Sequence, residues 1–280
     1  MTTPQKSMLQ DFPWDPLYAV SGIEDVLTPA LVMYPDVIVS NIDRTLDLLA
    51  GNADRWRVHI KTAKLAHTLH MLVERGVRNF KCATTLELLV ACRSGALDVL
   101  LAYPAIGANA RRAQEIGEQF PNVRISVLAE NPAQVQQWRA SRVGIFLDIN
   151  PGMNRTGIDQ SQPDKIVDVV RAIAAAGLAF RGLHYYDGQY GNLAESERTQ
   201  AAHRGYNHLL KLARELDRSA MPMPEVITSG TPTFPCSLAY EGFRRGKFLH
   251  RVSPGTVVYN DASSLHQLSS EYGYRPAALV

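Results

Sequence analysis

The sequence predicts a (β/α)8 barrel, because roughly eight short apolar runs alternate with helical segments along most of the chain. Each run is continuously apolar rather than alternating in polarity, which is typical of strands buried on both faces of a parallel sheet. Several of the intervening segments end at a glycine, as at Gly76, Gly95 and Gly177. An open doubly wound sheet is the competing architecture, and the barrel is favoured.

The elements follow in a regular order along the chain. A first helix is predicted over 36–51, where apolar residues recur close to helical spacing as far as Gly51. Strands are expected at 55–60, 79–83, 98–103, 123–129, 143–149, 179–185 and 225–229, with a weaker one around 249–253. Helices are expected between them at 64–75, 85–95, 107–120, 131–140, 164–177 and 195–219. A domain boundary, if there is one, falls near Pro254 and Gly255.

The composition favours a globular protein with a small-molecule partner. The 280 residues are 46% hydrophobic, which is enough to bury a full core, and the net charge is +2 without a basic stripe for nucleic acid. Cys82, Cys92 and Cys236 form no CxxC pair, so reduced thiols in the cytoplasm are expected. The amino terminus lacks the apolar core of a signal peptide, and no run is long enough to span a membrane.

Polar residues follow the predicted strands, at the edge where all the loops of a barrel converge. Lys61 emerges at the end of the apolar run 55–60 and is the first of them. The others are Thr62, Cys82–Thr84, Tyr103, Glu130, Asn154–Gly157, His184–Gly188 and Ser229–Thr233. Together, these residues at the strand ends supply an amine, a guanidinium, several phenols and a loop of small residues.

Such a set suits pyridoxal phosphate. The loop "SGTPT" follows the seventh strand, where barrels commonly bind phosphate, and a desolvated lysine can bind the cofactor's aldehyde as a Schiff base. Lys61 is the candidate for this lysine. Against this stand two simpler interpretations: the loop is an ordinary turn, and Lys61 belongs with Lys64 to a solvated first turn of a helix.

Two further residues have equally open interpretations. Arg155, in "DINPGMNRTG", either binds a carboxylate or the ring phenolate, or clamps the carbonyls of its own loop. Tyr186, in "GLHYYDG", either lies against the cofactor ring or is a core aromatic. His59 is expected to belong to the barrel wall or to support Lys61, and His184 to face either the mouth or the core.

Seven blocks together carry a resemblance: "HIKTAK", "FKCATTLELL", "DVLLAYPAIG", "FLDINPGMNRTGI", "GLHYYDGQ", "SGTPTFP" and "SPGTVVYNDAS". In this order and spacing they resemble the D-threonine aldolase and D-serine dehydratase family of fold-type III pyridoxal phosphate enzymes, from about Thr28 onward. The resemblance implies an alanine-racemase-type barrel over 31–253. It also implies a β domain built from segments 1–30 and 254–280, and a homodimer.

The resemblance also implies roles for individual residues. Lys61 would carry the cofactor, Arg155 would approach it, and Tyr186 would lie beside it. The phosphate would be held by Ser229, Gly230 and Thr231. Tyr259 and Asp261 would border the cofactor or line the mouth.

Two departures from the family pattern matter. Ile60 and Ala63 replace an alanine and a histidine that the lysine block often contains, so a neighbouring imidazole is missing. Members also usually continue beyond the segment that ends here at Val280, and that continuation carries the motif for an activating divalent metal, manganese or zinc. The β domain is therefore expected to be incomplete, and no metal ligand is assigned within the chain. His67 and His70 are interpreted as ordinary surface or packed histidines.

The expected activity is that of a lyase acting on a D-configured β-hydroxy amino acid. An aldolase would cleave the Cα–Cβ bond and release glycine and an aldehyde. A dehydratase would eliminate the hydroxyl, with the metal acting as Lewis acid on the same oxygen in either case. The "KCAT" and "TPTFP" blocks favour the aldolase. The same residues also suit an amino acid racemase, or a cofactor-binding protein without catalysis.

Overall fold

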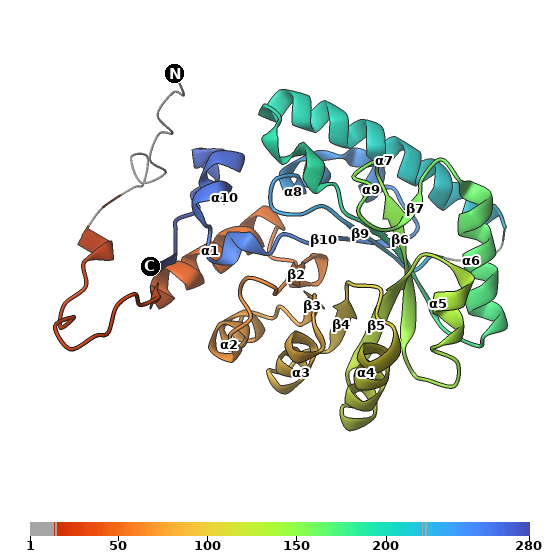
Figure 1. The fold of residues 1–280 in the computed structure, drawn as a ribbon. Helices are drawn as coiled ribbons and strands as arrows, with labels where there is room; N and C mark the ends of the chain where they lie inside the picture. Colours follow the sequence, from red (N-terminus) through yellow and green to blue (C-terminus); the bar gives the residue numbers. More distant parts are fainter. Residues whose placement is uncertain (1–13, 15, 220, 222) are drawn as a thin grey trace, which may run out of the picture.

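The computed structural model describes residue 14, residues 16–219, residue 221 and residues 223–280. Eight parallel strands form a barrel surrounded by helices (Figure 1). The sheet runs in the order β10-β9-β8-β6-β5-β4-β3-β2, with a short strand β7 (Ile158–Asp159) beside β6. The barrel strands are β2 (Arg57–His59), β3 (Asn79–Cys82), β4 (Asp98–Leu101), β5 (Arg124–Ala129), β6 (Gly144–Asn150), β8 (Phe180–Tyr185), β9 (Glu225–Thr228) and β10 (Leu249–Val252). All eight predicted strands are confirmed.

The seam between the first and last strands closes the sheet into a barrel. Trp56 and Val252 form a parallel bridge, and the Trp56 indole N–H donates a hydrogen bond of 2.9 Å to the carbonyl of Pro254. The Ser253 hydroxyl donates to the carbonyl of Arg57 at 2.8 Å. A Cβ at Gly255 would lie 2.0 Å from the carbonyl oxygen of His59, so the seam requires glycine there. These contacts exclude the open doubly wound sheet.

The helices alternate with the strands as the sequence predicts. They are α1 (Pro35–Leu48), α2 (Ala66–Glu74), α3 (Thr85–Arg93), α4 (Gly107–Gln119), α5 (Pro132–Gln136), α6 (Pro163–Ala175), α7 (Glu195–Arg218), α8 (Phe234–Ala239), α9 (Glu241–Arg244) and α10 (Ala262–Gln267). The helix expected over 131–140 ends at Gln136, and the chain then turns and reaches a positive φ of 61° at Ala140. Within the described residues, no helix has both the length and the apolar character needed to cross a membrane.

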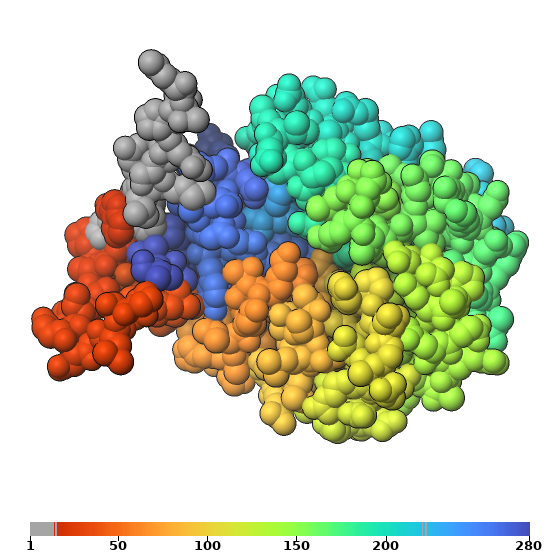
Figure 2. All heavy atoms as spheres, in the orientation of Figure 1, coloured from red at the N-terminus to blue at the C-terminus, as the bar shows by residue number. Residues whose placement is uncertain are grey.

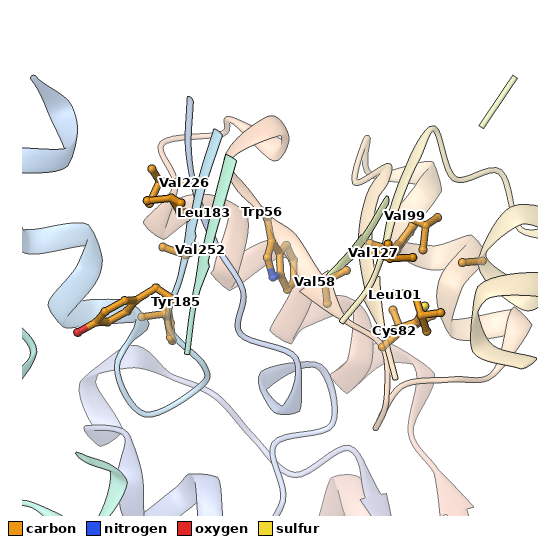
Figure 3. Close-up of a cluster of buried hydrophobic side chains, with 14 of the residues drawn as sticks. Trp56, Val58, Cys82, Val99, Leu101, Val127, Leu183, Tyr185, Val226 and Val252 are labelled. Carbon is orange, nitrogen blue, oxygen red and sulfur yellow. The ribbon is translucent and has the colours of Figure 1, made fainter. Parts of the chain in front are cut away.

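Each strand buries both of its faces. One face packs against the helices, as Val58, Cys82 and Val99 do in Figure 3. The other face fills the barrel, where Leu100, Leu128, Phe146 and Ile227 form a separate apolar cluster. Continuous apolar runs are the expected result of this arrangement, because neither face meets water.

An ion network lies inside the barrel near the amino ends of the strands. Arg57 is fully buried and forms bonds of 2.9 Å to Asp98 and 2.9 and 3.0 Å to the two oxygens of Glu225. Arg181 also reaches Asp98, at 3.0 Å, and Arg251 pairs with Glu225. Buried charges require such pairing, so these groups form a structural layer at the closed end of the barrel.

The two ends of the described chain meet beside the barrel. Strand β1 (Val32–Met33) pairs in antiparallel fashion with β11 (Ala278–Leu279), next to α1 and α10 (Figure 1). The Tyr18 hydroxyl donates to the carbonyl of Pro276 at 3.0 Å. The red segment before β1 projects from the body of the molecule (Figure 2). Division of the chain into units at 1–30, 31–253 and 254–280 stays a prediction.

Candidate active site

Lys61 lies at the mouth of the barrel, immediately after β2. Its backbone N–H donates to Nδ1 of His59 at 3.4 Å, so the imidazole fixes the chain at the point where the lysine leaves the strand. The Lys61 side chain is exposed, but partial burial of the amine and the nearby Arg155 lower its pKa, while Glu87 opposes this shift. Lys61 therefore loses its proton more readily than an ordinary surface lysine.

Arg155 and Tyr186 are stacked in the same mouth. The guanidinium carbon of Arg155 lies 4.7 Å from the centroid of the Tyr186 ring. The loop that carries Arg155 is held by the Asn150 side chain, whose oxygen accepts from the N–H groups of Gly152 at 2.9 Å and Asn154 at 3.0 Å. The arginine is thus fixed by its own turn and presents its charge to the mouth.

Two glycines shape the space around the Tyr186 ring. A Cβ at Gly188 would lie 2.4 Å from the phenol oxygen, and a Cβ at Gly230 would lie 2.7 Å from Cε2 of the ring. The ring therefore packs directly on the backbone of the loop after β9. Burial raises the pKa of the Tyr186 phenol, and Asp187 adds to this, whereas Arg155 opposes it.

The loop after β9 contains a buried polar group that fits an anionic ligand. Ser229 has a positive φ of 65°, and its hydroxyl donates to the carbonyl of Thr228 at 2.7 Å. The Thr231 hydroxyl is buried and has no hydrogen-bond partner among the described residues. Since buried polar groups are normally satisfied, a ligand oxygen is a suitable partner for it. At the adjacent Gly230 the missing side chain lets the Tyr186 ring lie against this loop.

Asp187 anchors this loop from the end of β8. It is fully buried, and its two oxygens accept from the Thr233 hydroxyl at 2.5 Å and the Tyr206 hydroxyl at 2.6 Å. Burial raises its pKa, and these two hydrogen bonds oppose the shift. Asp187 thus fixes Tyr186 and the Gly230 loop relative to each other.

A second lysine lies one layer deeper than Lys61. Lys81 is 2% exposed, and in the sheet it pairs with His59, two residues before Lys61. Its Nζ lies 3.3 Å from Nε2 of His184, whose Nδ1 lies 2.7 Å from Asp148. Asp148 also accepts from the Thr156 hydroxyl at 2.7 Å. The amine, the imidazole and the carboxylate form a continuous hydrogen-bonded line inside the barrel.

The electrostatics of this line are strongly perturbed. Burial, reinforced by the charges of Lys61 and Arg155, lowers the pKa of Lys81 to about 7, while Asp148 opposes the shift. Burial and Lys81 likewise lower the pKa of His184. Burial acts to raise the pKa of Asp148, but its hydrogen bonds from His184 and Thr156 outweigh this and the net shift is downward. The carboxylate is therefore fully charged at neutral pH, whereas Lys81 is close to its midpoint of titration.

The remaining predicted residues lie after β10. Tyr259 is buried, and its hydroxyl is 2.8 Å from that of Thr68 on α2. Asp261 caps α10 by accepting from the backbone N–H of Ser264 at 2.9 Å. Between them, Asn260 has a positive φ of 47° and a buried side-chain oxygen without a partner among the described residues. Their roles toward a cofactor stay predictions.

The structure brings Lys61, Arg155 and Tyr186 together as the sequence suggested. Sequence reasoning missed Lys81 and Asp148, and left His184 open between core and mouth. The sequence did contain a signal for Lys81, because it is a charged residue within the otherwise apolar strand segment "FKCAT". Among the described residues, no group of three His, Cys, Asp or Glu side chains is placed to hold a metal ion.

Comparison with known proteins agrees with this geometry. The family model described as the N-terminal domain of alanine racemase matches residues 35–263. The chain belongs to this family. No curated protein sequence matches the chain.

Solved structures share the family's fold at low identity. D-threonine aldolase from Filomicrobium marinum matches with a TM-score of 0.80 and 22% identity, over 91% of this chain and 69% of that one. D-threo-3-hydroxyaspartate dehydratase from Delftia sp. HT23 matches with a TM-score of 0.76 and 20% identity, over 91% and 66%. Lysine/ornithine decarboxylase from Vibrio vulnificus matches with a TM-score of 0.67 and 16% identity, over 86% and 66%. The chain thus spans about two thirds of the length of these structures. Pyridoxal phosphate is the cofactor that the fold-type III family implies.

Proposed function

We propose that the protein is a pyridoxal phosphate-dependent lyase that cleaves a D-configured β-hydroxy amino acid into glycine and an aldehyde, as a D-threonine aldolase does. The observation that carries the proposal is the convergence, at one barrel mouth, of the Lys61 amine, Arg155 and the Thr231 hydroxyl, which has no hydrogen-bond partner in the described part of the chain. An amine, a cation and a polar group able to bind an anion are what this cofactor and an amino acid require.

The residues divide the binding of the cofactor among them. Lys61 would bind the aldehyde covalently, because its lowered pKa makes the neutral amine accessible. Gly230 and Thr231 would hold the phosphate, and Tyr186 would pack against the ring. When bound, pyridoxal phosphate supplies an electron sink for the bonds at Cα.

Other side chains would act on the substrate. Arg155 carries a fixed positive charge at the exposed rim, where it would bind the substrate carboxylate. Its contact with Tyr186 would keep it aligned, since guanidinium groups stack favourably on aromatic rings. A divalent metal, manganese or zinc, belongs to the proposal as a Lewis acid on the β-hydroxyl, and we assign it no ligand.

A dehydratase acting at the same site is the second candidate. The similarity to D-threo-3-hydroxyaspartate dehydratase is nearly as great as that to D-threonine aldolase, with TM-scores of 0.76 and 0.80. The two reactions differ in which bond at the substrate breaks, and both use the same amine and anion sites. Products of the reaction, rather than the site residues, distinguish them.

We also propose that the protein is a cytoplasmic homodimer. Cys82, Cys92 and Cys236 are buried and form no disulfide among the described residues, which fits a reducing compartment. The segment before β1 exposes the apolar side chains of Ile23, Val26, Leu27 and Leu31, and Leu27 is 92% exposed. A second copy would remove this apolar surface from water.

The first experiment is a spectrum of the purified protein with pyridoxal phosphate before and after borohydride. A band near the visible edge is expected in the wild type and in Lys64→Ala, which removes a neighbouring exposed lysine, but not in Lys61→Ala. Peptide mapping of the reduced protein should place the adduct on Lys61. An adduct on Lys81, or none, would refute the assignment.

Product analysis with D-threonine then identifies the reaction. Glycine with acetaldehyde supports the aldolase, and a keto acid supports the dehydratase. The L-isomer would indicate a racemase, and absence of turnover in a protein that binds the cofactor would indicate a non-catalytic binding protein.

A further inference from the structure

Lys81 has no part in the proposed chemistry, yet it is the most perturbed amine of the mouth. It is buried at 2% exposure, and its Nζ lies 5.8 Å from the centroid of the Tyr186 ring. That ring in turn packs on Gly230, in the loop proposed to hold phosphate. Lys81 is therefore close to the anion site without being part of its surface.

The surroundings of Lys81 are predominantly cationic. The carboxylates that face it are Asp148, which it reaches only through His184, and Asp187 after β8. The charged and titratable groups around it are Arg57 and His59 on β2, Lys61 after β2, Asp148 on β6, Arg155 after β6, His184 on β8, and Tyr186 and Asp187 after β8. Asp98 and Glu225 pair with Arg57 and offset its charge, so among the described residues Lys61 and Arg155 provide the unpaired positive charge nearest the mouth. In the unliganded protein this excess of positive charge, together with burial, disfavours a further ammonium group.

An anion in the mouth reverses that balance. A phosphate near Thr231 and Gly230 adds about two negative charges at neutral pH, within the low-dielectric surroundings of the same barrel end. Lys81 is suited to take up charge in response, because its Nζ lies 5.8 Å from the centroid of the Tyr186 ring that packs on Gly230, and because its partner His184 is bonded in turn to the Asp148 carboxylate. The Lys81 variants described below separate its share from that of Lys61, whose pKa is also lowered by burial and Arg155.

We propose that Lys81 becomes fully protonated, drawing on solvent, when a phosphate-bearing ligand binds in the mouth, so that its ammonium group offsets the negative charge of the ligand. The inference rests on the proposed cofactor site. Lys81 is a positioning residue: it holds a proton at Nζ and forms no bond to substrate or cofactor. Without a ligand, neutral Lys81 avoids repulsion from Lys61 and Arg155. With a phosphate bound, the protonated form attracts the negative charge of the ligand.

Calorimetric titration with pyridoxine 5'-phosphate tests this inference. That ligand carries the phosphate and the ring but has no aldehyde, so covalent binding to Lys61 does not contribute. Heats measured in two buffers of different ionisation enthalpy give the number of protons taken up on binding. An amine with a pKa of about 7 is roughly one quarter protonated at pH ~7.5, so the wild type should take up roughly three quarters of a proton through Lys81.

Matched variants isolate that contribution. Lys81→Met removes the amine and keeps the length of the side chain, and Lys81→Gln is a second variant should methionine fold poorly. Lys64→Met removes an exposed lysine near the mouth, which pairs with Glu87 at 3.6 Å, and serves as the control. Ionisation of the ligand itself is common to all the proteins, so it cancels in the comparison. The Lys81 variants should lose the proton uptake, and the Lys64 variant should retain it.

The pH dependence of affinity gives an independent reading. Between pH ~7 and ~8.5, affinity of the wild type relative to Lys81→Met should fall by up to about tenfold per pH unit, because binding and protonation are linked. Equal proton uptake and a constant affinity ratio in wild type and Lys81→Met would overturn the inference while leaving the cofactor site intact. No binding by the wild type at millimolar pyridoxine 5'-phosphate would instead refute the proposed site, and the inference with it.

Discussion

Replacing Lys81 by methionine should make the unliganded protein more stable at neutral pH. Lys81 is 2% exposed, and burial with the nearby cations lowers its pKa from the ordinary 10.5 to about 7. Each unit of pKa corresponds to about 1.4 kcal/mol, so the full shift represents roughly 5 kcal/mol of destabilisation, which falls to roughly 4 kcal/mol at pH 7 because the folded-state amine is half protonated there. Methionine avoids this cost and forfeits the hydrogen bond to His184, worth about 1 kcal/mol. The net gain should be about 3 kcal/mol, within the range of about 1–4 kcal/mol for replacing buried ions by apolar residues.

The sign of the pH dependence follows from the same shift. Between pH 7 and 10.5 the unfolded chain holds the Lys81 proton and the folded chain does not, so stability of the wild type rises with pH across this window. Below pH 7 both states are protonated and the cost is constant. The advantage of Lys81→Met should therefore be greatest at and below pH 7 and should vanish near pH ~10.

Thermal unfolding followed by circular dichroism is the assay. A gain of about 3 kcal/mol should raise Tm by roughly 6–12 °C at pH 7. Lys64→Met should change stability by less than about 0.5 kcal/mol, because Lys64 is exposed. A Lys81→Met protein that is less stable than the wild type at pH 7, or a difference that is the same at pH 7 and 10, would refute the reasoning.

Three further outcomes are expected. Gly182→Ala should prevent folding, since a Cβ there would lie 1.8 Å from the carbonyl oxygen of Glu225 and φ is +128°; appearance of a folded barrel by circular dichroism would contradict this. Gly230→Ala should weaken pyridoxine 5'-phosphate binding at least about tenfold while Tm changes little. The new methyl group would lie 2.7 Å from Cε2 of Tyr186 and would push that ring aside. Calorimetry showing unchanged affinity would argue against the loop as the phosphate site. Asp148→Asn should flatten the acid limb of the stability curve. The pKa of Asp148 is lowered in the folded state, so the wild-type carboxylate contributes stability above its unfolded pKa and loses it as pH falls; an acid denaturation midpoint and slope identical in both proteins would oppose this.

The barrel architecture and the residues at the rim of its mouth were predictable from the amino-acid sequence. Strands buried on both faces must be continuously apolar, so each of the eight apolar runs could be recognised separately. Glycines that follow the helical segments marked the ends of several helices. The sequence also predicted that Lys61, Arg155 and Tyr186 lie at the mouth. Each follows the end of a strand, and the strand ends converge in a barrel. Only local pattern and chain order were needed for these predictions.

The residues beneath that rim became visible only in the folded structure. A strand buried on both faces has no polar alternation to show which residues point into the barrel, so the inward direction of Lys81 could not be inferred. Its partner His184 is 103 residues away in the chain, and Asp148 is reached only through that imidazole. Closure of the sheet at Trp56 and Val252 brings them together. The lowered pKa of Lys81 arises from this enclosure, because burial and neighbouring charges act through space and not along the sequence.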